Sequence, residues 1–407
     1  MKTTRYEYSK LFKDIYTFRG FKYVRIQHHS DQVDIHLKRT RKTGICRNCG
    51  KRNRHLKESY TRTIRDLDLG PKTCYITFTE YKLHCRCGYR GFETIEFSRP
   101  YSRCTKRYEE YIVRLTERMT VSDVSMITGM DWKTVKDIDK HYIKERLVGL
   151  KDITPRRLGV DEVAYEKGHK YLTVVRDLDL KCVIWIGLNR RKDTLDAFFN
   201  LLGKEKQRLI SVVVLDMWDP YIASIKEYCP TTDMVFDKFH ILKKMNEAVD
   251  TVRKQEFAQA RKEEQVQMKR KRFIMLKRGK NLTAEQQELL QQLMENNEQL
   301  YKAYLLKEQI SDIFDEESYT SAIQRLQKWI ENVNESGISP FKTVLNTFRR
   351  YSYGIHNYFI YHLTNAGSEG FNTKINIIRR KAYGFWDLEY FMLKIFQSCG
   401  VMKMDPT

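Results

Sequence analysis

The sequence lacks long hydrophobic runs. No apolar stretch approaches the length of a membrane span, and the mean hydropathy is −0.60, so we expect no transmembrane helix. The first thirty residues lack a continuous apolar segment behind a basic start, so we expect no secretory signal. These absences predict a cytoplasmic protein whose nine cysteines are thiols or metal ligands rather than disulfides.

Acidic residues are scarce relative to basic ones. The chain has 74 Lys and Arg against 52 Asp and Glu, which gives a net charge of +22 at neutral pH. Such an excess favours a polyanionic partner, most simply nucleic acid, over the alternative of an ordinary enzyme with a basic, solvated surface. At 407 residues, 41% of them hydrophobic, the chain is long enough for several domains.

Two short apolar runs each end on an aspartate. Residues 211–216 hold consecutive apolar residues followed by Asp216, and residues 157–163 place Asp161 after a similar run. This pattern predicts buried strands whose last side chains lie at the carboxyl edge of an open α/β sheet, where such sheets bind ligands. A third acid, Glu369, stands at the start of a predicted helix. Together the three acids predict a site for divalent metal ions.

The elements around the two aspartates follow the order of a ribonuclease H-like fold. Three strands joined by short turns are expected to pair antiparallel, and helices then alternate with strands. In that fold the first and fourth strands lie side by side and parallel, so Asp161 and Asp216 are expected to be neighbours. The predicted strands are 158–163, 171–176, 182–187, 211–216 and 234–237, and the predicted helices are 193–203 and 221–228.

The segment that follows these elements is strongly charged and predicts only helices. We therefore expect residues 249–340 to form an all-helical insertion into the sheet fold. A capping box from Thr283 to Gln286 is expected to begin one of its helices. The function of the insertion is open between a clamp on DNA or on a partner and a solvated helical hairpin.

Four cysteines have the spacing of a zinc ribbon. Cys46 and Cys49 form a Cys-x-x-Cys pair, strands follow, and Cys85 and Cys87 form a tighter Cys-x-Cys pair. Four thiolates satisfy the tetrahedral preference of Zn²⁺ and stabilise a module whose core is otherwise too small. His84 is an alternative to one of these ligands, and a set of buried thiols is the alternative to a metal site. The predicted strands of this module are 31–38 and 73–82.

Residues 121–138 have the pattern of a helix-turn-helix. A short helix, a turn at Gly129 and a second helix capped by Asp131 are predicted. The side chains expected in its core are Val121, Val124, Ile127, Val135 and Ile138. Those expected to face outward, where a recognition helix meets phosphates and base edges, are Lys133, Thr134 and Lys136. The alternative is a plain helical hairpin that links two domains.

The third acid lies on an amphipathic helix predicted from 368 to 382. Helical periodicity places Glu369 on a polar face, opposite an apolar stripe that faces the sheet. The polar face also holds Asn372, Thr373, Asn376 and Arg380, and the stripe holds Phe371, Ile375, Ile378 and Ala382. The side chains expected to bind phosphates are Lys374, Arg379, Arg380 and Lys381. The alternative is a solvated amphipathic helix without a site.

These acids suit phosphoryl transfer on DNA, which requires activation of a nucleophile and stabilisation of a leaving oxygen. Two Mg²⁺ (or Mn²⁺) ions about 3.5–4 Å apart supply both, and three carboxylates suffice to hold them. Among the remaining acids, Glu162 is expected on the opposite face of its strand. Asp219 is the alternative to Asp216. Asp237 and His240 are expected to support the metal ligands or to contact DNA, and a structural role is the alternative for Asp237.

On these motifs the chain resembles the DDE transposases of bacterial insertion sequences, in the branch named after the ISL-three element. The resemblance covers nearly the whole length, and its last three blocks are specific, whereas the helix-turn-helix is not. The blocks are Cys46 to Cys49, the helix-turn-helix, Gly159 to Glu162, Leu215 to Tyr221, Phe236 to His240 and Ser368 to Lys374.

The resemblance implies a catalytic triad of Asp161, Asp216 and Glu369. It also implies that the amino-terminal modules bind the terminal inverted repeats of the element. Water would then nick the element ends, and the freed 3′-hydroxyl would attack target DNA. The expected domains are a zinc ribbon (1–103), a helix-turn-helix (104–152), a catalytic domain in two parts (153–248 and 341–407) and the helical insertion between them (249–340).

Two other functions compete with transposition. One is a structure-selective DNA nuclease of the same fold, and the other is a DNA-binding regulator that descends from a transposase and is catalytically inactive. The intact acid triad argues against the regulator, and the zinc ribbon with its helix-turn-helix argues against a nuclease that reads only DNA shape. The expected partners are double-stranded DNA and further copies of this chain, in a dimer or higher oligomer at the bacterial nucleoid.

Overall fold

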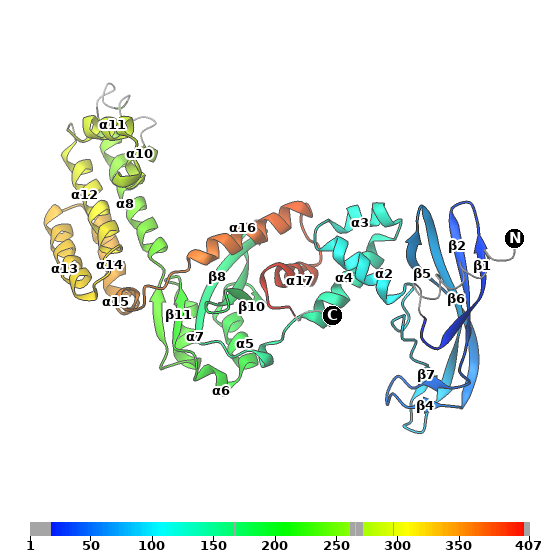
Figure 1. Ribbon diagram of the computed structural model, residues 1–407. Coiled ribbons are helices and arrows are strands. Elements are labelled where there is room, and N and C mark those ends of the chain that lie inside the picture. Colours follow the sequence, from blue (N-terminus) through cyan, green and yellow to red (C-terminus); the bar gives the residue numbers. More distant parts are fainter. Residues whose placement is uncertain (1–17, 167, 261–264, 266–271, 296, 403–407) are drawn as a thin grey trace. The chain divides into compact units, whose positions relative to one another are not determined.

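In the computed structural model the chain folds into two compact units, Met1–Glu145 (unit 1) and Arg146–Thr407 (unit 2) (Figure 1). The structure describes residues 18–166, 168–260, 265, 272–295 and 297–402; it does not describe the side chains at 366, 368 and 369. Among the described residues, none of the helices combines the length and the hydropathy that crossing a membrane requires.

Unit 1 begins with a mixed β-sheet. Its strands are β1 (Phe21–His28), β2 (Gln32–Arg39), β5 (Leu56–Leu69), β6 (Lys72–His84) and β7 (Arg90–Phe92), with the order β1-β2-β6-β5 and β7 paired to β6. The polar–apolar alternation predicted for β2 is confirmed, because Val33, Ile35 and Leu37 are buried. The small strands β3 (Gly44–Ile45) and β4 (Arg52–Asn53) form a separate hairpin beside the cysteines.

Among the described residues of unit 1, three helices follow the strands: α2 (Lys106–Thr116), α3 (Val121–Thr128) and α4 (Trp132–Arg146). The predicted turn is confirmed, since Gly129 ends α3 with a φ of 67° and Asp131 Oδ1 accepts from the first backbone N–H groups of α4. The capping box at Thr120 begins α3.

The predicted core of these helices is correct except at one position. Val124, Val135 and Ile138 are buried, and Val121 packs beside them. Ile127, however, is 57% exposed. Helix α2 contributes Tyr108 and Ile112 to the same core, so the short helix α3 packs through Val121 and Val124, and Ile127 in its last turn faces solvent.

Unit 2 is built on the predicted five-stranded sheet. Its strands are β8 (Arg157–Glu166), β9 (Lys170–Asp177), β10 (Cys182–Leu188), β11 (Val212–Leu215) and β12 (Asp233–Phe236), in the order β10-β9-β8-β11-β12. The first three strands pair antiparallel, and β11 lies parallel to both β8 and β12. The predicted pairing of the first and fourth strands is therefore confirmed. All residues of β11 are buried, as its apolar run predicts.

Helices cover both faces of this sheet (Figure 1). Helices α5 (Lys192–Leu202) and α7 (Asp219–Tyr228) bury one face, and the short α6 (Lys204–Gln207) follows α5. Helices α16 (Ala366–Lys381) and α17 (Leu388–Cys399) cover the other face. The predicted apolar stripe of α16 is confirmed, because Phe371, Ile375 and Ile378 pack with Val163 and Leu172 of the sheet.

The described residues between β12 and α16 are helical, as predicted for the insertion. They form α8 (Lys238–Gln259), α10 (Arg272–Leu276), α11 (Ala284–Glu295), α12 (Glu298–Ile313), α13 (Tyr319–Ser336), α14 (Ser339–Arg350) and α15 (Ser352–Tyr361). The predicted capping box is present, with hydrogen bonds between Thr283 and Gln286 in both directions. Helix α15 returns to the sheet, where the Asn357 side chain donates to the Met234 carbonyl at 2.9 Å.

Helix α15 packs closely on β12 through a glycine. A Cβ at Gly354 would lie 2.4 Å from the buried ring of Phe236. Gly354→Ala is therefore expected to destabilise unit 2 by about 1–3 kcal/mol through overpacking. Gly370→Ala is the matched control, because it also lies in a helix but has no neighbour within 4 Å of the added methyl group. Calorimetric unfolding of both variants checks this; an unchanged Gly354→Ala transition would contradict the packing of α15 on β12.

Candidate active site

The register of two parallel strands brings the predicted aspartates together. Val212 pairs with Arg157 and Val214 with Gly159. Continuing this register by two residues places Asp216 beside Asp161. Strand β8 is longer than predicted and runs on to Glu166, so Asp161 lies within the strand rather than at its end. The shorter β11 ends at Leu215. At the level of Asp161, β8 therefore has no paired strand on the side of β11.

Asp216 is surrounded by other titratable groups. Asp216 Oδ1 lies 2.9 Å from Nε2 of His240, which belongs to the first turn of α8. Burial raises the pKa of the Asp216 carboxyl, and the charges of Asp161 and Asp237 add to this effect, whereas His240 opposes it. Burial alone would lower the pKa of His240, but the contact with Asp216 outweighs burial and raises it.

Asp237 also belongs to this acidic cluster. It caps α8, and its side chain accepts from the backbone N–H of Phe239 at 3.1 Å. Burial raises the pKa of the Asp237 carboxyl, and the charge of Asp161 raises it further. Acids that repel one another in a buried place are stabilised in their ionised forms by a divalent cation. The cluster is therefore suited to bind one.

A buried polar contact fixes the start of α16 against this cluster. The side-chain amide of Asn365, the residue before α16, donates to the Val160 carbonyl at 3.2 Å. Its side-chain oxygen accepts from the buried guanidinium of Arg176 on β9, and its backbone bonds to Asp237. A Cβ at Gly159 would lie 2.8 Å from Asn365 Oδ1. Glycine is needed there because the helix start approaches the strand so closely.

Helix α16 also contacts the first aspartate directly. Asn372 Nδ2 donates to Asp161 Oδ2 at 3.0 Å. Position 369 lies three residues earlier on the same helix, and positions three apart share one helix face. The Glu369 side chain itself is among those that the structure does not describe.

The remaining acids of the region have other partners. Glu162 accepts from Arg190 at 3.0 Å, and the Arg190 guanidinium lies over the rings of Tyr171 and Trp218, at 4.3 and 4.7 Å from their centroids. Asp219 begins α7, is exposed, and accepts from Arg350 at 2.6 Å and Tyr351 at 2.8 Å. It thus connects the start of α7 to the end of α14, and its place as the alternative to Asp216 stays a prediction.

The basic residues predicted to contact DNA are placed on two helices. On α4, Lys133 is exposed while Thr134 and Lys136 are half-buried, and both lysines lie within 6 Å of the half-exposed Trp132 ring. On α16, Lys374, Arg380 and Lys381 are exposed, and Arg379 donates to the Ala164 carbonyl at 2.8 Å. This hydrogen bond uses one nitrogen of the Arg379 guanidinium, which has further N–H groups that could bind a phosphate.

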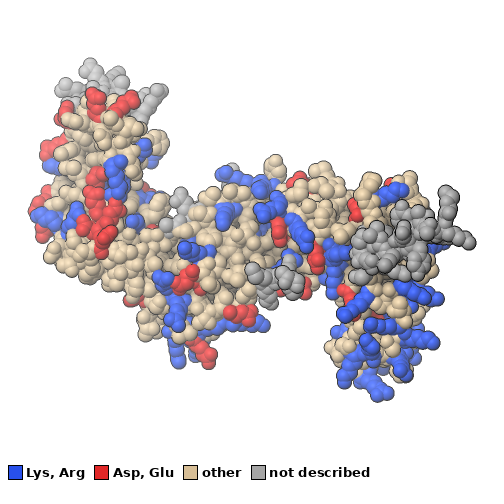
Figure 2. Space-filling view, in the orientation of Figure 1, with Lys and Arg blue, Asp and Glu red and all other residues tan. Residues whose placement is uncertain are grey.

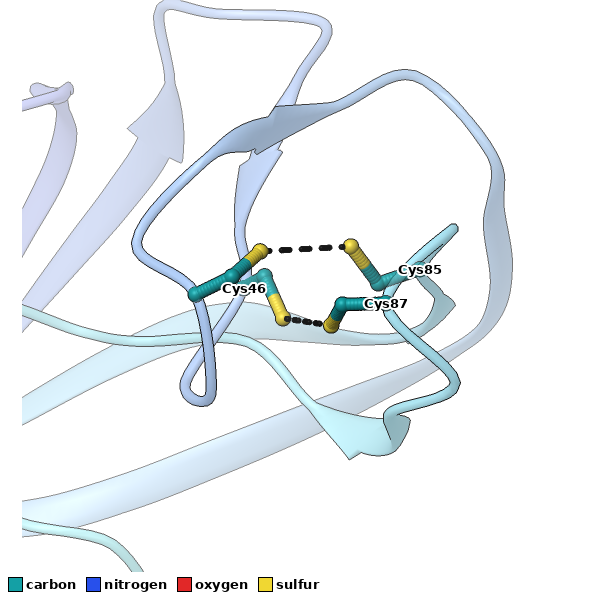
Figure 3. Close-up of side chains that lie close together, drawn as sticks. Cys46, Cys85 and Cys87 are labelled. Carbon is teal, nitrogen blue, oxygen red and sulfur yellow. Dashed lines mark hydrogen bonds between the residues drawn. The ribbon is translucent and has the colours of Figure 1, made fainter.

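The four predicted cysteines come together in unit 1 (Figure 3). The Sγ atoms of Cys46 and Cys87 are 3.7 Å apart, and those of Cys49 and Cys85 are 3.6 Å apart. Sulfurs at about 2.3 Å from a tetrahedral Zn²⁺ would be about 3.8 Å from one another, so the donor set fits this ion. Among the described residues His84 is not a member of the group; its carbonyl accepts from Asn53 instead.

The surroundings of this centre are basic. The backbone N–H of Tyr89 and the side-chain amide of Asn48 lower the pKa of the Cys87 thiol to about 6. No Asp or Glu occurs at 41–57 or at 84–92. Figure 2 shows Lys and Arg gathered over this end of unit 1, near β4 and β7. The other five cysteines are all buried, as core residues are.

The sequence analysis did not identify three residues that make polar contacts around the site: Arg176, Asn365 and Arg190. A charged residue that follows the apolar run of β9 was a signal for Arg176, because such a residue must find a partner when buried. Asn365 had no comparable signal, since its role depends on two strands that are far from it in the sequence.

The cysteine geometry predicts a structural zinc ion. Cys49→Ala is expected to reduce zinc content from about one ion per chain to near zero and to unfold the β3–β4 hairpin, because three thiolates leave the tetrahedral site incomplete. Cys229→Ala is the control, since it removes a buried thiol of unit 2 outside the group. Elemental analysis of purified protein measures this. Full zinc content in Cys49→Ala, or none in the unaltered chain, would contradict the assignment.

Comparisons with known proteins agree with this geometry. A family model described as a transposase matches residues 158–395, a helix-turn-helix domain of transposase family ISL3 matches 93–143, and a zinc-finger of transposase IS204/IS1001/IS1096/IS1165 matches 42–87. The chain is 30% identical to the transposase for insertion sequence element IS1001 of Bordetella parapertussis, over 95% of this chain and 97% of that protein. It is 25% identical to the transposase for IS1557 of Mycobacterium tuberculosis, over 77% of each. The chain therefore belongs to the ISL3 family of transposases.

Proposed function

We propose that this protein binds the terminal inverted repeats of an insertion sequence and catalyses Mg²⁺-dependent DNA cleavage and strand transfer. The observation that carries the proposal is the parallel register of β11 and β8, which sets Asp216 beside Asp161. In this proposal Asp161, Asp216 and Glu369 are the catalytic triad and the metal ligands. Two divalent ions would supply an activated nucleophile and a stabilised leaving oxygen.

The protein's own residues orient these ligands. Asn372 holds Asp161, and His240 lies against Asp216. Asn365 fixes the first turn of α16, and with it the backbone at Glu369, to the strand that carries Asp161. Such supporting contacts restrict the carboxylates to few conformations, which favours metal binding.

The strand order supports a ribonuclease H-like assignment for unit 2. Three antiparallel strands are followed by two parallel ones, with the first strand in the centre beside the fourth. The helical insertion falls between the last strand and the helix with the third acid. We propose the same domains as the sequence predicts. They are the zinc ribbon (1–103), the helix-turn-helix (104–152), the two parts of the catalytic domain (153–248 and 341–407) and the helical insertion (249–340).

DNA recognition is proposed for the amino-terminal modules. Lys133, Thr134 and Lys136 of α4 would meet the element ends, and the basic zinc-binding end would contact phosphates. A dimer or larger oligomer on DNA is part of the proposal, because it would supply one active site for each end of the element. The protein would act on bacterial DNA at the nucleoid.

Cleavage and joining are tested with a labelled element-end duplex, target DNA and Mg²⁺. The unaltered protein is expected to give a joined product, whereas a nuclease would give cleavage alone and an inactive regulator only a shifted band. Asp216→Asn is expected to lower the cleavage rate at least about 100-fold, because loss of a metal ligand costs more than the 10–100-fold typical of an outer contact.

End binding by Asp216→Asn should remain within about twofold of the unaltered chain, since unit 1 is intact. Asp179→Asn is the matched control, because Asp179 is a partly exposed acid in the turn between β9 and β10 and pairs with Arg157. Unchanged cleavage by Asp216→Asn would refute the triad. Loss of end binding as well would assign Asp216 a structural role.

A further inference from the structure

Two large aromatic side chains are fully exposed in the loop between α16 and α17. They are Tyr383 and Trp386, and the loop is shaped by positive φ angles of 51° at Tyr383 and 107° at Gly384. Exposing aromatic rings of this size to water is unfavourable, and such rings commonly mark a binding surface. The loop packs on unit 2 through Phe385, which lies against Phe391 of α17, so its backbone is held while the other two rings point away.

A groove lies between β8 and α16, next to the acidic cluster. It has a volume of about 450 Å³ and is lined by Glu162, Val163, Ala164, Glu166, Asn372, Asn376 and Arg379. Asn372, Asn376 and Arg379 are spaced at four and three residues, so they form one face of α16. The groove thus begins at Asn372, which holds Asp161, and extends to the last turn of α16.

The charge of this region suits a phosphate backbone. The last turn of α16 holds Arg379, Arg380 and Lys381, and Figure 2 shows basic side chains gathered over α16. The two acids of the groove are compensated, because Glu162 pairs with Arg190 and Glu166 with Lys170. Amide and guanidinium donors beside exposed aromatic rings are the combination by which proteins bind nucleic-acid strands.

We propose that the groove and the Tyr383–Trp386 loop form a track for the DNA strand next to the scissile phosphate, with an aromatic ring against a base. This proposal rests on the proposed function, because the triad defines where the scissile phosphate lies. From position 369 to its end at Lys381 the helix rises about 18 Å, and the two rings lie in the loop beyond that end. At about 3.4 Å per nucleotide, the rings would meet the strand about six nucleotides from the cleavage position.

A second copy of this chain is the competing occupant of the loop. A twofold contact brings the same patch of each protomer together, so the three basic residues at the end of α16 would face their own copies. Like charges so placed repel. Charge complementarity therefore favours DNA.

The track is tested by a photo-crosslinking residue, p-benzoylphenylalanine, at position 386 of the full-length chain bound to a labelled element-end duplex without divalent metal. The expected result is a crosslink to one strand, centred about six nucleotides from the cleavage position. The same residue at position 201 is the control, since Leu201 is exposed on α5, which covers the opposite face of the sheet. A crosslink at 386 only to protein, or one no stronger than at 201, would overturn the proposal.

A second measurement separates this proposal from the proposed function. Tyr383→Ala with Trp386→Ala is expected to lower end cleavage about 10-fold or more, and the variant that carries Phe at both positions is expected to recover most of it, because stacking needs only a ring. The unfolding temperature should not change, since both rings are exposed. Cleavage by the double alanine variant at the unaltered rate would overturn the track alone. A crosslink at 386 in a protein that never cleaves would overturn the triad alone.

Discussion

The pairing of β11 with β8 is the constraint on which the rest of unit 2 depends. Parallel neighbours with this register place two aspartates side by side, although 54 residues separate them in the sequence. Burial and mutual repulsion raise the pKa of the Asp216 carboxyl, so the arrangement costs stability in the absence of a cation. Other interactions must offset this cost. The burial of apolar side chains from β11 and its flanking helices contributes the stabilising free energy.

The polar contacts around the acids have a common role. Arg176, Asn365 and Asn372 lie on a strand, a loop and a helix, and together they hold α16 against β8. Arg176 and Asn365 are buried, so their hydrogen bond is electrostatically stronger than it would be in water. The basic surfaces of the chain, by contrast, are exposed and suit a partner that arrives from solution.

Much of this arrangement follows from the sequence, and the exceptions have physical reasons. The run before Asp216 predicts β11 because an apolar strand must be buried on both faces. Strand β8 extends past its apolar part since its hairpin with β9 supplies the backbone bonds, whatever the side chains are. Strand β5 was not predicted because its first half is largely exposed and carries no alternation. Ile127 was placed wrongly because helical periodicity cannot tell how much of a face the neighbouring helix covers.

The central claim is that three distant acids share divalent ions, and iron-directed cleavage of the polypeptide tests it most directly. Fe²⁺ accepts the same oxygen ligands as Mg²⁺, and with ascorbate and peroxide it cuts the backbone near its ligands. The account predicts cuts near positions 161, 216 and 369 together, all suppressed by excess Mg²⁺. Cuts near only one of these positions, or cuts that Mg²⁺ does not suppress, would contradict it.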